Sequence, residues 1–503
     1  MADETSLERF LADEQATALF GEDIALALKP GDLIALFGDL GAGKTTLARA
    51  IIRSLAGDPE LEVPSPTFTL VQSYEARLDV QHFDLYRLTA PEELDELGFD
   101  EAENTGVVIV EWPERAGGRL PAAAILIRLE HEGFGRRATI EAAPGAAARL
   151  RRTQAIRDFL RDSGWGGARR AFLQGDASTR AYETLLHEGR EPRILMNAPR
   201  QPDGPPIRDG KPYSQIAHLA ESVTPFVAVA KILKQEGFAA PGVFAHDLAQ
   251  GLLMIEHLGE DGFLDAQGSP VRERYVAAAE ALAAVHARKW PEKPEAEAGV
   301  SHAIPPYDRG AMMVEAELTI DWYLPATTGR PVTEAEREAF GAAWAAVLDR
   351  LEGAEKSLVL RDFHSPNLIW RKDRSGMDRV GILDFQDALI GPAAYDVASL
   401  AQDARVTIAP DLERATIDAY KQARSSGQFD GEAFEEAYAI MAAQRNSKIL
   451  GIFVRLDRRD GKPAYLKHLP RIRDYAERAL RHPALADLRD FYLHHDLIDE
   501  NAR

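Results

Sequence analysis

The chain carries the stretch Gly38-Asp39-Leu40-Gly41-Ala42-Gly43-Lys44-Thr45, which fits the pattern G-x-x-x-x-G-K-[ST]. An apolar run at 34–37 precedes it, and a sequence typical of a helix follows at 46–52. In such a strand–loop–helix unit, backbone N–H groups of the loop and the helix N-terminus bind phosphate oxygens. Lys44 is expected at the β- and γ-phosphates and Thr45 on Mg²⁺. The expected nucleotide-binding residues are Gly38, Gly41, Ala42, Gly43, Lys44, Thr45 and Thr46.

Working outward from this loop, further short apolar runs predict strands at 67–74, 79–84, 107–111 and 124–130. Strands that alternate with helices indicate an α/β domain with a mainly parallel sheet covered by helices. An alanine-rich segment of low complexity, 142–148, lies past the last of these runs. We therefore predict a first domain at 1–147, and a helix at 151–163 that opens a second domain at 148–503.

Three stretches around the glycine loop carry a resemblance to a known family. They are Ser65-Pro66-Thr67-Phe68, His82-Phe83-Asp84-Leu85-Tyr86-Arg87 and Val110-Glu111-Trp112-Pro113-Glu114-Arg115. Nearly all of 1–147 resembles the ATPase subunit of the bacterial machinery that makes threonylcarbamoyladenosine at position 37 of tRNA.

The resemblance implies an ATP-hydrolysing P-loop domain that works with protein partners, a threonylcarbamoyl transferase and its companion subunit. It places Thr67 in a switch-like segment, and Asp84 and Glu111 in the handling of Mg²⁺ and water. A carboxylate at a strand end beside the loop suits either task. Contact with tRNA is expected to be indirect, through the partners. Trp112 is interpreted as a core residue.

A second phosphate-handling signature lies more than 300 residues further on. It consists of Arg361-Asp362-Phe363-His364-Ser365-Pro366-Asn367 and Leu383-Asp384-Phe385. In a kinase, an aspartate placed like Asp362 accepts the proton of the acceptor hydroxyl. Asn367 and Asp384 are then the ligands of Mg²⁺. Two complete signatures of different families predict a fusion of two ATP-using enzymes.

The second region resembles the aminoglycoside phosphotransferase-like superfamily of small-molecule kinases. The closer resemblance is to bacterial kinases that phosphorylate the anomeric hydroxyl of N-acetylmuramate and N-acetylglucosamine in cell-wall sugar recycling. The matching stretches are 175–180, 383–388, 395–405 and 444–465. The resemblance implies a two-lobed, protein-kinase-like α+β domain, with an N-lobe at about 156–258 and a helical C-lobe at about 259–503.

Further ligand contacts follow from this resemblance. Gly175 and Ser178 lie in a turn expected to cover the phosphates, and Glu256 and Leu258 lie in the connection between the lobes, where backbone groups meet adenine. The segment that resembles the sugar-facing region contains Tyr307, Asp308 and Glu315. Carboxylates and aromatic rings suit a sugar, although ordinary helix packing explains Tyr307 equally well.

Two positions depart from the kinase pattern. Leu360 occupies the place of the kinase H-R-D histidine, and Met196 stands where a kinase strand supplies a phosphate-binding lysine. They keep two alternatives open. In the first alternative, the second region is a kinase for another alcohol, of the aminoglycoside or choline type. In the second, it is a regulatory pseudokinase.

Composition narrows the setting. The 503 residues include no cysteine, which excludes disulfides and thiolate metal sites, and the net charge of −21 argues against broad nucleic-acid binding. The start of the sequence lacks the pattern of a signal peptide, and the chain has no run of 18 apolar residues. We therefore expect a cytoplasmic protein without membrane contact.

Overall fold

The computed structural model describes residues 5–102, 106–173, 180–425 and 429–499. Two compact units make up the chain, Met1–Asn197 and Ala198–Arg503, and each is considered by itself. Among the residues described, none of the helices has both the length and the apolar character needed to cross a membrane.

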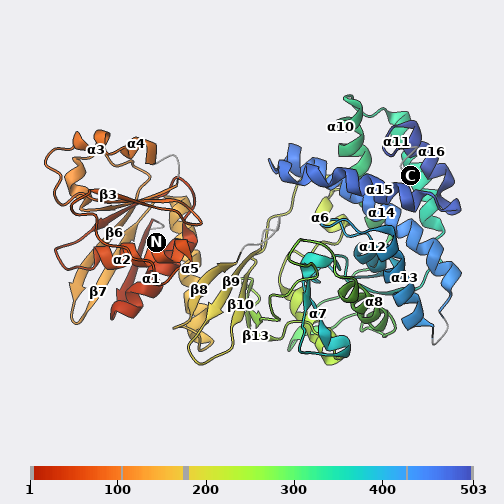
Figure 1. Cartoon of the computed structure of the whole chain (residues 1–503), viewed down its shortest axis with the longest axis horizontal. Coiled ribbons are helices and arrows are strands. Elements are labelled where there is room, and N and C mark those ends of the chain that lie inside the picture. Colours follow the sequence, from red (N-terminus) through yellow and green to blue (C-terminus); the bar gives the residue numbers. More distant parts are fainter. Residues whose placement is uncertain (1–4, 103–105, 174–179, 426–428, 500–503) are drawn as a thin grey trace. The chain divides into compact units, whose positions relative to one another are not determined.

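The first unit is built on a seven-stranded sheet with the order β1-β7-β6-β2-β5-β4-β3 (Figure 1). The inner strands β6, β2, β5 and β4 run parallel, whereas β1, β7 and β3 pair antiparallel with their neighbours. The sheet is therefore mixed and not mainly parallel as predicted, because the unpredicted strands β1 and β7 and the hairpin of β3 with β4 add antiparallel edges. The strands are β1 (Ser6–Leu11), β2 (Leu33–Phe37), β3 (Val71–Tyr74), β4 (Val80–Asp84), β5 (Val107–Glu111), β6 (Ile125–Glu132) and β7 (Gly135–Glu141).

Strand β2 shows why both faces of this sheet are covered. Its side chains alternate, so Ile34 and Leu36 enter one apolar core while Leu33 and Ala35 enter another on the opposite face. The longer helices of this unit are neighbours, with α1 against both α2 and α5 (Figure 1). The helices are α1 (Glu14–Ala27), α2 (Lys44–Ala56), α3 (Glu93–Glu96), α4 (Phe99–Ala102) and α5 (Pro144–Asp162).

Helix α5 begins seven residues before the predicted start at 151, within the alanine-rich segment 142–148. Alanine is the strongest helix former, and Pro144 is well suited to the first turn of a helix. Ala147 and Leu150 are buried in the core of the unit. The first unit then adds an antiparallel meander of β8 (Arg169–Leu173), β9 (Ala181–Leu186) and β10 (Arg193–Asn197). The predicted division of function at residue 147 stays a prediction.

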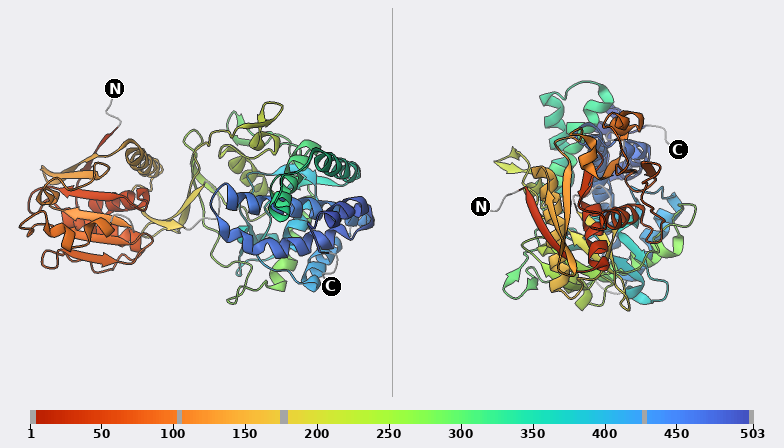
Figure 2. Two further views of the ribbon diagram at one scale, coloured as in Figure 1. Left: turned by 90° about the horizontal axis from the view of Figure 1, so that it is seen from above. Right: turned by 90° about the vertical axis from the view of Figure 1, so that its left-hand side faces the viewer.

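The second unit places short hairpins against a large helical part (Figure 2). Strands β17 and β20 pair antiparallel, as do β18 and β19, so the loops after β17 and β19 carry the second predicted motif. The strands are β11 (Pro206–Arg208), β12 (Lys211–Pro212), β13 (Val243–Asp247), β14 (Leu252–Glu256), β15 (Glu295–Glu297), β16 (Val300–Ser301), β17 (Lys356–Val359), β18 (Leu368–Trp370), β19 (Val380–Ile382) and β20 (Leu389–Pro392).

The helical part is organised around α14, which spans 28 residues and contacts α9, α12 and α15. Its apolar and small residues are buried through most of its length, as expected for a central helix. The helices are α6 (Tyr213–Ile216), α7 (Thr224–Gln235), α8 (Arg272–His286), α9 (Arg309–Ala316), α10 (Leu324–Thr328), α11 (Glu334–Asp349), α12 (Ala394–Ala401), α13 (Pro410–Arg424), α14 (Gly431–Arg458), α15 (Leu469–Leu480) and α16 (Ala486–His494).

Candidate functional sites

The glycine loop connects β2 to α2 as predicted. Gly38, Gly41 and Gly43 adopt φ angles of 142°, 80° and 101°, a region that side chains disfavour. A Cβ atom at Gly38 would lie 2.6 Å from the carbonyl oxygen of Leu129, so only glycine fits there. Lys44 Nζ donates hydrogen bonds to the carbonyl oxygens of Gly38 (2.7 Å) and Asp39 (3.0 Å). The loop therefore closes around its own lysine. Ala42 is buried in the adjacent core.

Carboxylates meet the loop at the ends of two adjacent strands. Asp84 and Glu111 are register partners at the ends of β4 and β5. Thr45 Oγ1 donates to Glu111 Oε2 at 2.8 Å, and Thr67 Oγ1 donates to Asp84 Oδ2 at 2.8 Å. Ser65 also donates to Asp84. The structure thus brings together the predicted residues Thr45, Thr67, Asp84 and Glu111.

Three residues at this site were not predicted. The Trp112 ring centroid lies 3.6 Å from Lys44 Nζ, so this residue contacts the loop lysine and is not simply a core residue. His82 Nε2 lies 3.0 Å from Glu111 Oε1, and both side chains are buried. The Arg136 guanidinium lies where a side chain at Gly43 would be, and its buried Nε has no hydrogen-bond partner within the described residues. His82 and Trp112 stand inside the quoted motifs, but no pattern marks Arg136.

The electrostatics of Lys44 reflect a partly enclosed site. Burial lowers the pKa of its ammonium group, and the nearby carboxylates of Glu111, Glu114 and Asp84 oppose that effect. Thr46, the next residue but one, turns its side chain to a cavity between helices on another side of α2. Its predicted contribution to nucleotide binding rests on its backbone N–H.

The second site lies in the loops after β17 and β19. Asn367 Nδ2 donates to the carbonyl oxygen of Asp362 at 2.9 Å and to Asp384 Oδ2 at 3.3 Å. Gln386 Nε2 donates to Asp384 Oδ1 at 2.9 Å. Burial raises the pKa of Asp362, but the positive charges of Lys448 and Arg361 outweigh it and hold the pKa below its usual range. Asn367 therefore links the backbone of Asp362 to the carboxylate of Asp384, and the low pKa of Asp362 keeps its carboxylate ionised at neutral pH.

Buried acids hold the loop that carries Asp362. Asp396 accepts hydrogen bonds from the backbone N–H groups of Leu360 (2.6 Å) and Arg361 (2.9 Å). Asp403 accepts one from the N–H of Ser365 at 2.8 Å. These bonds hold Arg361 at a φ of 67°, and they support the loop where Leu360 replaces the kinase histidine.

Glu315 lies behind this loop and is fully buried. It pairs with Arg361 and with Lys448 Nζ (2.9 Å), and Tyr307 and Gln444 also donate to it. Burial raises its pKa, but the two cations outweigh that effect and lower the pKa to about 2. The buried positions of Tyr307 and Glu315 favour a role in positioning Arg361 over the predicted contact with a sugar.

The other predicted contacts are placed as follows. Asp308 caps α9 through the N–H of Ala311 (2.8 Å) and lies 3.0 Å from His218 Nε2, with its side chain half exposed. Glu256 ends β14 and pairs with Lys234 Nζ at 2.5 Å, two residues before Leu258. Gly175 and Ser178 lie outside the described residues.

Comparisons with known proteins test the predicted fusion. The family described as "Threonylcarbamoyl adenosine biosynthesis protein TsaE" matches residues 11–139, and the "Phosphotransferase enzyme family" matches residues 169–436.

Individual relatives match the same two regions. The N-acetylmuramate/N-acetylglucosamine kinase of Caulobacter vibrioides is 37% identical over 66% of this chain and 94% of its own length. The kinase of the same name from Pseudomonas putida is 30% identical over 66% of this chain and 91% of its own. The tRNA threonylcarbamoyladenosine biosynthesis protein TsaE of Rickettsia conorii is 43% identical over 24% of this chain and 69% of its own.

These matches confirm that two nucleotide-using families are joined in one polypeptide. The chain belongs to the phosphotransferase enzyme family, in the group of N-acetylmuramate/N-acetylglucosamine kinases, and its N-terminal region belongs to the TsaE family.

Proposed function

We propose that the second region transfers the γ-phosphate of ATP to the anomeric C1 hydroxyl of N-acetylmuramate or N-acetylglucosamine. The observation that carries this is that Asn367 bonds the backbone carbonyl of Asp362 and the carboxylate of Asp384, in a chain whose relatives are kinases of that name. The product, a sugar 1-phosphate, suits the recycling of cell-wall sugars.

In this reaction the C1 hydroxyl oxygen forms a bond to the γ-phosphorus while the bond from that phosphorus to the β–γ bridging oxygen breaks. Asp362 accepts the hydroxyl proton, and ADP leaves. Arg361 and its partner Glu315 fix the backbone from which Asp362 extends. Stabilising charge at a fixed position is the largest contribution that a protein makes to such a step.

The residues also fit Mg²⁺, which usually takes one or two protein carboxylates together with substrate phosphates. The Asp384 carboxylate and the Asn367 amide oxygen would hold it in the second region, and Thr45 with Asp84 or Glu111 in the first. When bound, Mg²⁺ supplies charge that neutralises the phosphate oxygens.

For the first region we propose an ATPase that supports threonylcarbamoylation of A37 in tRNA. The hydrogen bond from Thr45 to Glu111, beside Asp84, supports it because these are the groups needed to hold a metal and orient water. We expect its partners to be a threonylcarbamoyl transferase and a companion subunit, which make the main contacts with tRNA. ATP and tRNA are both cytoplasmic, and so is the proposed site of action.

The kinase is tested by incubating the full chain with ATP and each amino sugar, beside Asp362→Asn and the exposed control Asp349→Asn. We expect sugar 1-phosphate from the wild type and the control, with a rate about 10²–10⁴-fold lower for Asp362→Asn because the proton acceptor is lost. Near-normal transfer by a folded Asp362→Asn variant would contradict the assignment. Turnover of another alcohol alone would favour the aminoglycoside or choline type.

The ATPase is tested by hydrolysis in the presence of the two partner proteins, with Lys44→Ala and the exposed control Lys29→Ala. Lys44→Ala is expected to lose stimulated hydrolysis by about 10²–10³-fold, because one preorganised phosphate contact disappears. Unchanged stimulated turnover would count against the assignment.

One observation favours a second candidate for the second region. Met196 is buried on β10, so this strand offers no ammonium group at that position to clamp the phosphates. A regulatory pseudokinase would bind ATP with Mg²⁺ and transfer nothing to any alcohol. The adjacency of Asp362, Asn367 and Asp384 weighs against it, because a binding module has no need of a proton acceptor.

A further inference from the structure

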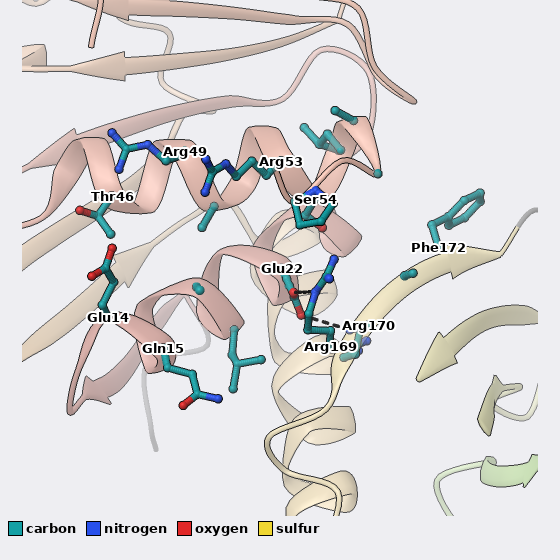
Figure 3. A pocket seen from close by; sticks show the side chains of 18 of the residues that line it. Glu14, Gln15, Glu22, Thr46, Arg49, Arg53, Ser54, Arg169, Arg170 and Phe172 are labelled. Carbon is teal, nitrogen blue, oxygen red and sulfur yellow. Dashed lines mark hydrogen bonds and ion pairs between the residues drawn. The ribbon is translucent and has the colours of Figure 1, made fainter. Parts of the chain in front are cut away.

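A cavity of about 890 Å³ lies in the first unit, away from the glycine loop (Figure 3). Helices α1 and α2 form two of its sides, and strand β8 closes a third. Its volume falls in the range of sites for small molecules. The cavity thus joins residues of the TsaE-like region to the first strand of the phosphotransferase match.

The α2 side of the cavity carries arginines. Arg49 and Arg53 lie one turn apart on α2, and their Nε atoms donate to the carbonyl oxygens of Val63 (3.1 Å) and Leu61 (2.8 Å). Arg77 donates from Nη2 to the carbonyl oxygen of Ala25 at 2.9 Å and stacks 4.7 Å from the Phe172 ring centroid. These backbone contacts orient the guanidinium groups and leave their charge uncompensated.

None of Arg49, Arg53 and Arg77 forms an ion pair with a carboxylate in the part of the chain that the structure describes. Burial lowers the pKa of the Arg77 guanidinium, which shows that its charge is partly desolvated without an acidic neighbour. In a chain with a net charge of −21, three such cations along one cavity are unusual. A guanidinium in that setting is suited to a bound anion.

The acids near β8 are already committed to other arginines. Asp23 contacts both Arg157 and Arg170 at 2.7 Å, and Arg170 also pairs with Glu183 at 2.6 Å, all in buried positions. Glu22 accepts from Arg169 and from the backbone N–H of Arg170. This network fixes β8 to α1, so the cavity has a rigid wall, and it withholds two acids of α1 from Arg49, Arg53 and Arg77.

The end of the cavity at the start of α2, one turn before Arg49, is polar and acidic. In Figure 3 the side chains of Glu14, on α1, and Thr46, on α2, lie near each other, and Gln15 also lines the cavity. Carboxylate, amide and hydroxyl groups bind the hydroxyls of a sugar, whereas a carboxylate repels a long polyanion. A ligand that carries phosphate at one end and hydroxyls at the other matches both ends.

We propose that this cavity binds a phosphorylated sugar, with the phosphate at Arg49, Arg53 and Arg77 and the sugar hydroxyls toward Glu14 and Thr46. Two sources share this chemistry: a free sugar phosphate and the ribose phosphate of a nucleotide. The first source rests on the kinase function proposed above, whereas the second does not. Helix α2 begins at Lys44, directly after the glycine loop, so a ligand in this cavity contacts the same helix that carries Lys44.

Equilibrium dialysis of the full chain tests the proposal with labelled N-acetylglucosamine 1-phosphate, ADP, and unphosphorylated N-acetylglucosamine. The variants are Arg49→Gln/Arg53→Gln and, separately, Arg77→Gln. The control is Arg151→Gln/Arg161→Gln on α5. Wild type is expected to bind one molecule of N-acetylglucosamine 1-phosphate or of ADP in this cavity, in addition to any bound elsewhere. In the cavity variants the dissociation constant for that one molecule is expected to rise about 10–100-fold for each arginine replaced. The control and the unphosphorylated sugar are expected to show no such change.

The phosphorylated probe whose binding is weakened in the cavity variants shows whether the ligand is a free sugar phosphate or a nucleotide. Identical binding of both phosphorylated probes by wild type and cavity variants would overturn the proposal, as would binding of a tRNA oligonucleotide alone. Retained ATP hydrolysis and sugar phosphorylation show that a variant is folded. If the double variant Arg49→Gln/Arg53→Gln does not fold, Arg77→Gln alone tests the proposal. The probes are supplied already phosphorylated, so cavity binding should persist in Asp362→Asn and is separable from a failed kinase assignment.

Discussion

At the glycine loop of the first unit, the functional groups sit at the ends of neighbouring strands and hold one another. In the second unit, the catalytic loop is held by buried acids from distant helices. Asp84 and Glu111 are register partners, and Thr45 follows directly from the loop. By contrast, Asp362 depends on Asp396 from α12 and on Glu315 from α9.

The two sites differ in what holds their functional groups in position. Backbone geometry and three glycines shape the first site, so its form survives many changes elsewhere. The second site relies on ionised groups inside a core, where removing one partner leaves an uncompensated charge. We therefore expect substitutions in the supporting residues to disturb the second site far more than the first.

The largest effect is expected for Glu315→Gln. The variant leaves Arg361 and Lys448 buried without a carboxylate, which costs about 3–5 kcal/mol in the free energy of unfolding. Urea unfolding of the full chain checks this, with Glu317→Gln at the end of the same helix as the matched control, because Glu317 pairs with the half-exposed Arg208. An equal loss in both variants would mean that the buried ion pairs of Glu315 contribute no more than the half-exposed pair of Glu317.

The same substitution has a predicted pH dependence. The pKa of Glu315 is lowered to about 2 in the folded protein from 4.5, so its stabilisation is present above pH 4.5 and is lost as the pH falls toward 2. The difference in unfolding free energy between wild type and Glu315→Gln should therefore be constant near neutrality and shrink below about pH 4.5. A difference that grows as the pH falls would contradict the pairing.

A smaller effect is expected for Asp396→Asn. Two backbone N–H groups lose their ionised acceptor, at a cost of about 1.5–3 kcal/mol, and the loop that carries Asp362 loosens. Because Asp396 touches neither substrate, kcat for sugar phosphorylation should fall while KM for the sugar stays within about twofold. A change confined to KM would show that Asp396 acts on substrate binding instead.

The smallest effect is expected for Trp112, beside the lysine of the glycine loop. Trp112→Leu removes the aromatic face beside Lys44, worth about 0.5–2 kcal/mol, and keeps an apolar side chain. Partner-stimulated hydrolysis should show a KM for ATP raised by a few-fold, with the free energy of unfolding nearly unchanged. Destabilisation as large as that of Glu315→Gln would mean that the first site also depends on its supporting residues.

This contrast also explains what could be predicted from the sequence. The loop 38–45 is contiguous, and the strands that deliver Asp84 and Glu111 are short apolar runs with clear ends, so pattern and chemistry agreed. The Ala-rich segment 142–148 was predicted to hold a domain boundary but not a helix, although alanine favours helix and α5 begins at Pro144. The antiparallel strands β1 and β7 were not predicted, although Gly133 lies in the turn between β6 and β7.

The residues that hold the second site in place cannot be recognised from the sequence around them. Glu315 and Lys448 are separated by 132 residues that pass through several helices, and each reads as an ordinary charged residue on a helix. Their partnership depends on tertiary packing, as does the approach of Arg136 to Gly43. Such pairs become visible only when burial and geometry are known.

The contact between α1 and β8 bears on whether the chain could be divided at the predicted boundary. Arg157 and Arg170 belong to the C-terminal side of the predicted boundary, yet their partner Asp23 belongs to the N-terminal side. A break at residue 147 would place Asp23 and its two arginine partners on separate pieces, and an arginine left without Asp23 would be costly to keep in this interior. Residues on both sides of the predicted boundary thus share one buried charge network, so the helix and strand that follow residue 147 help to complete the interior of the region that precedes it.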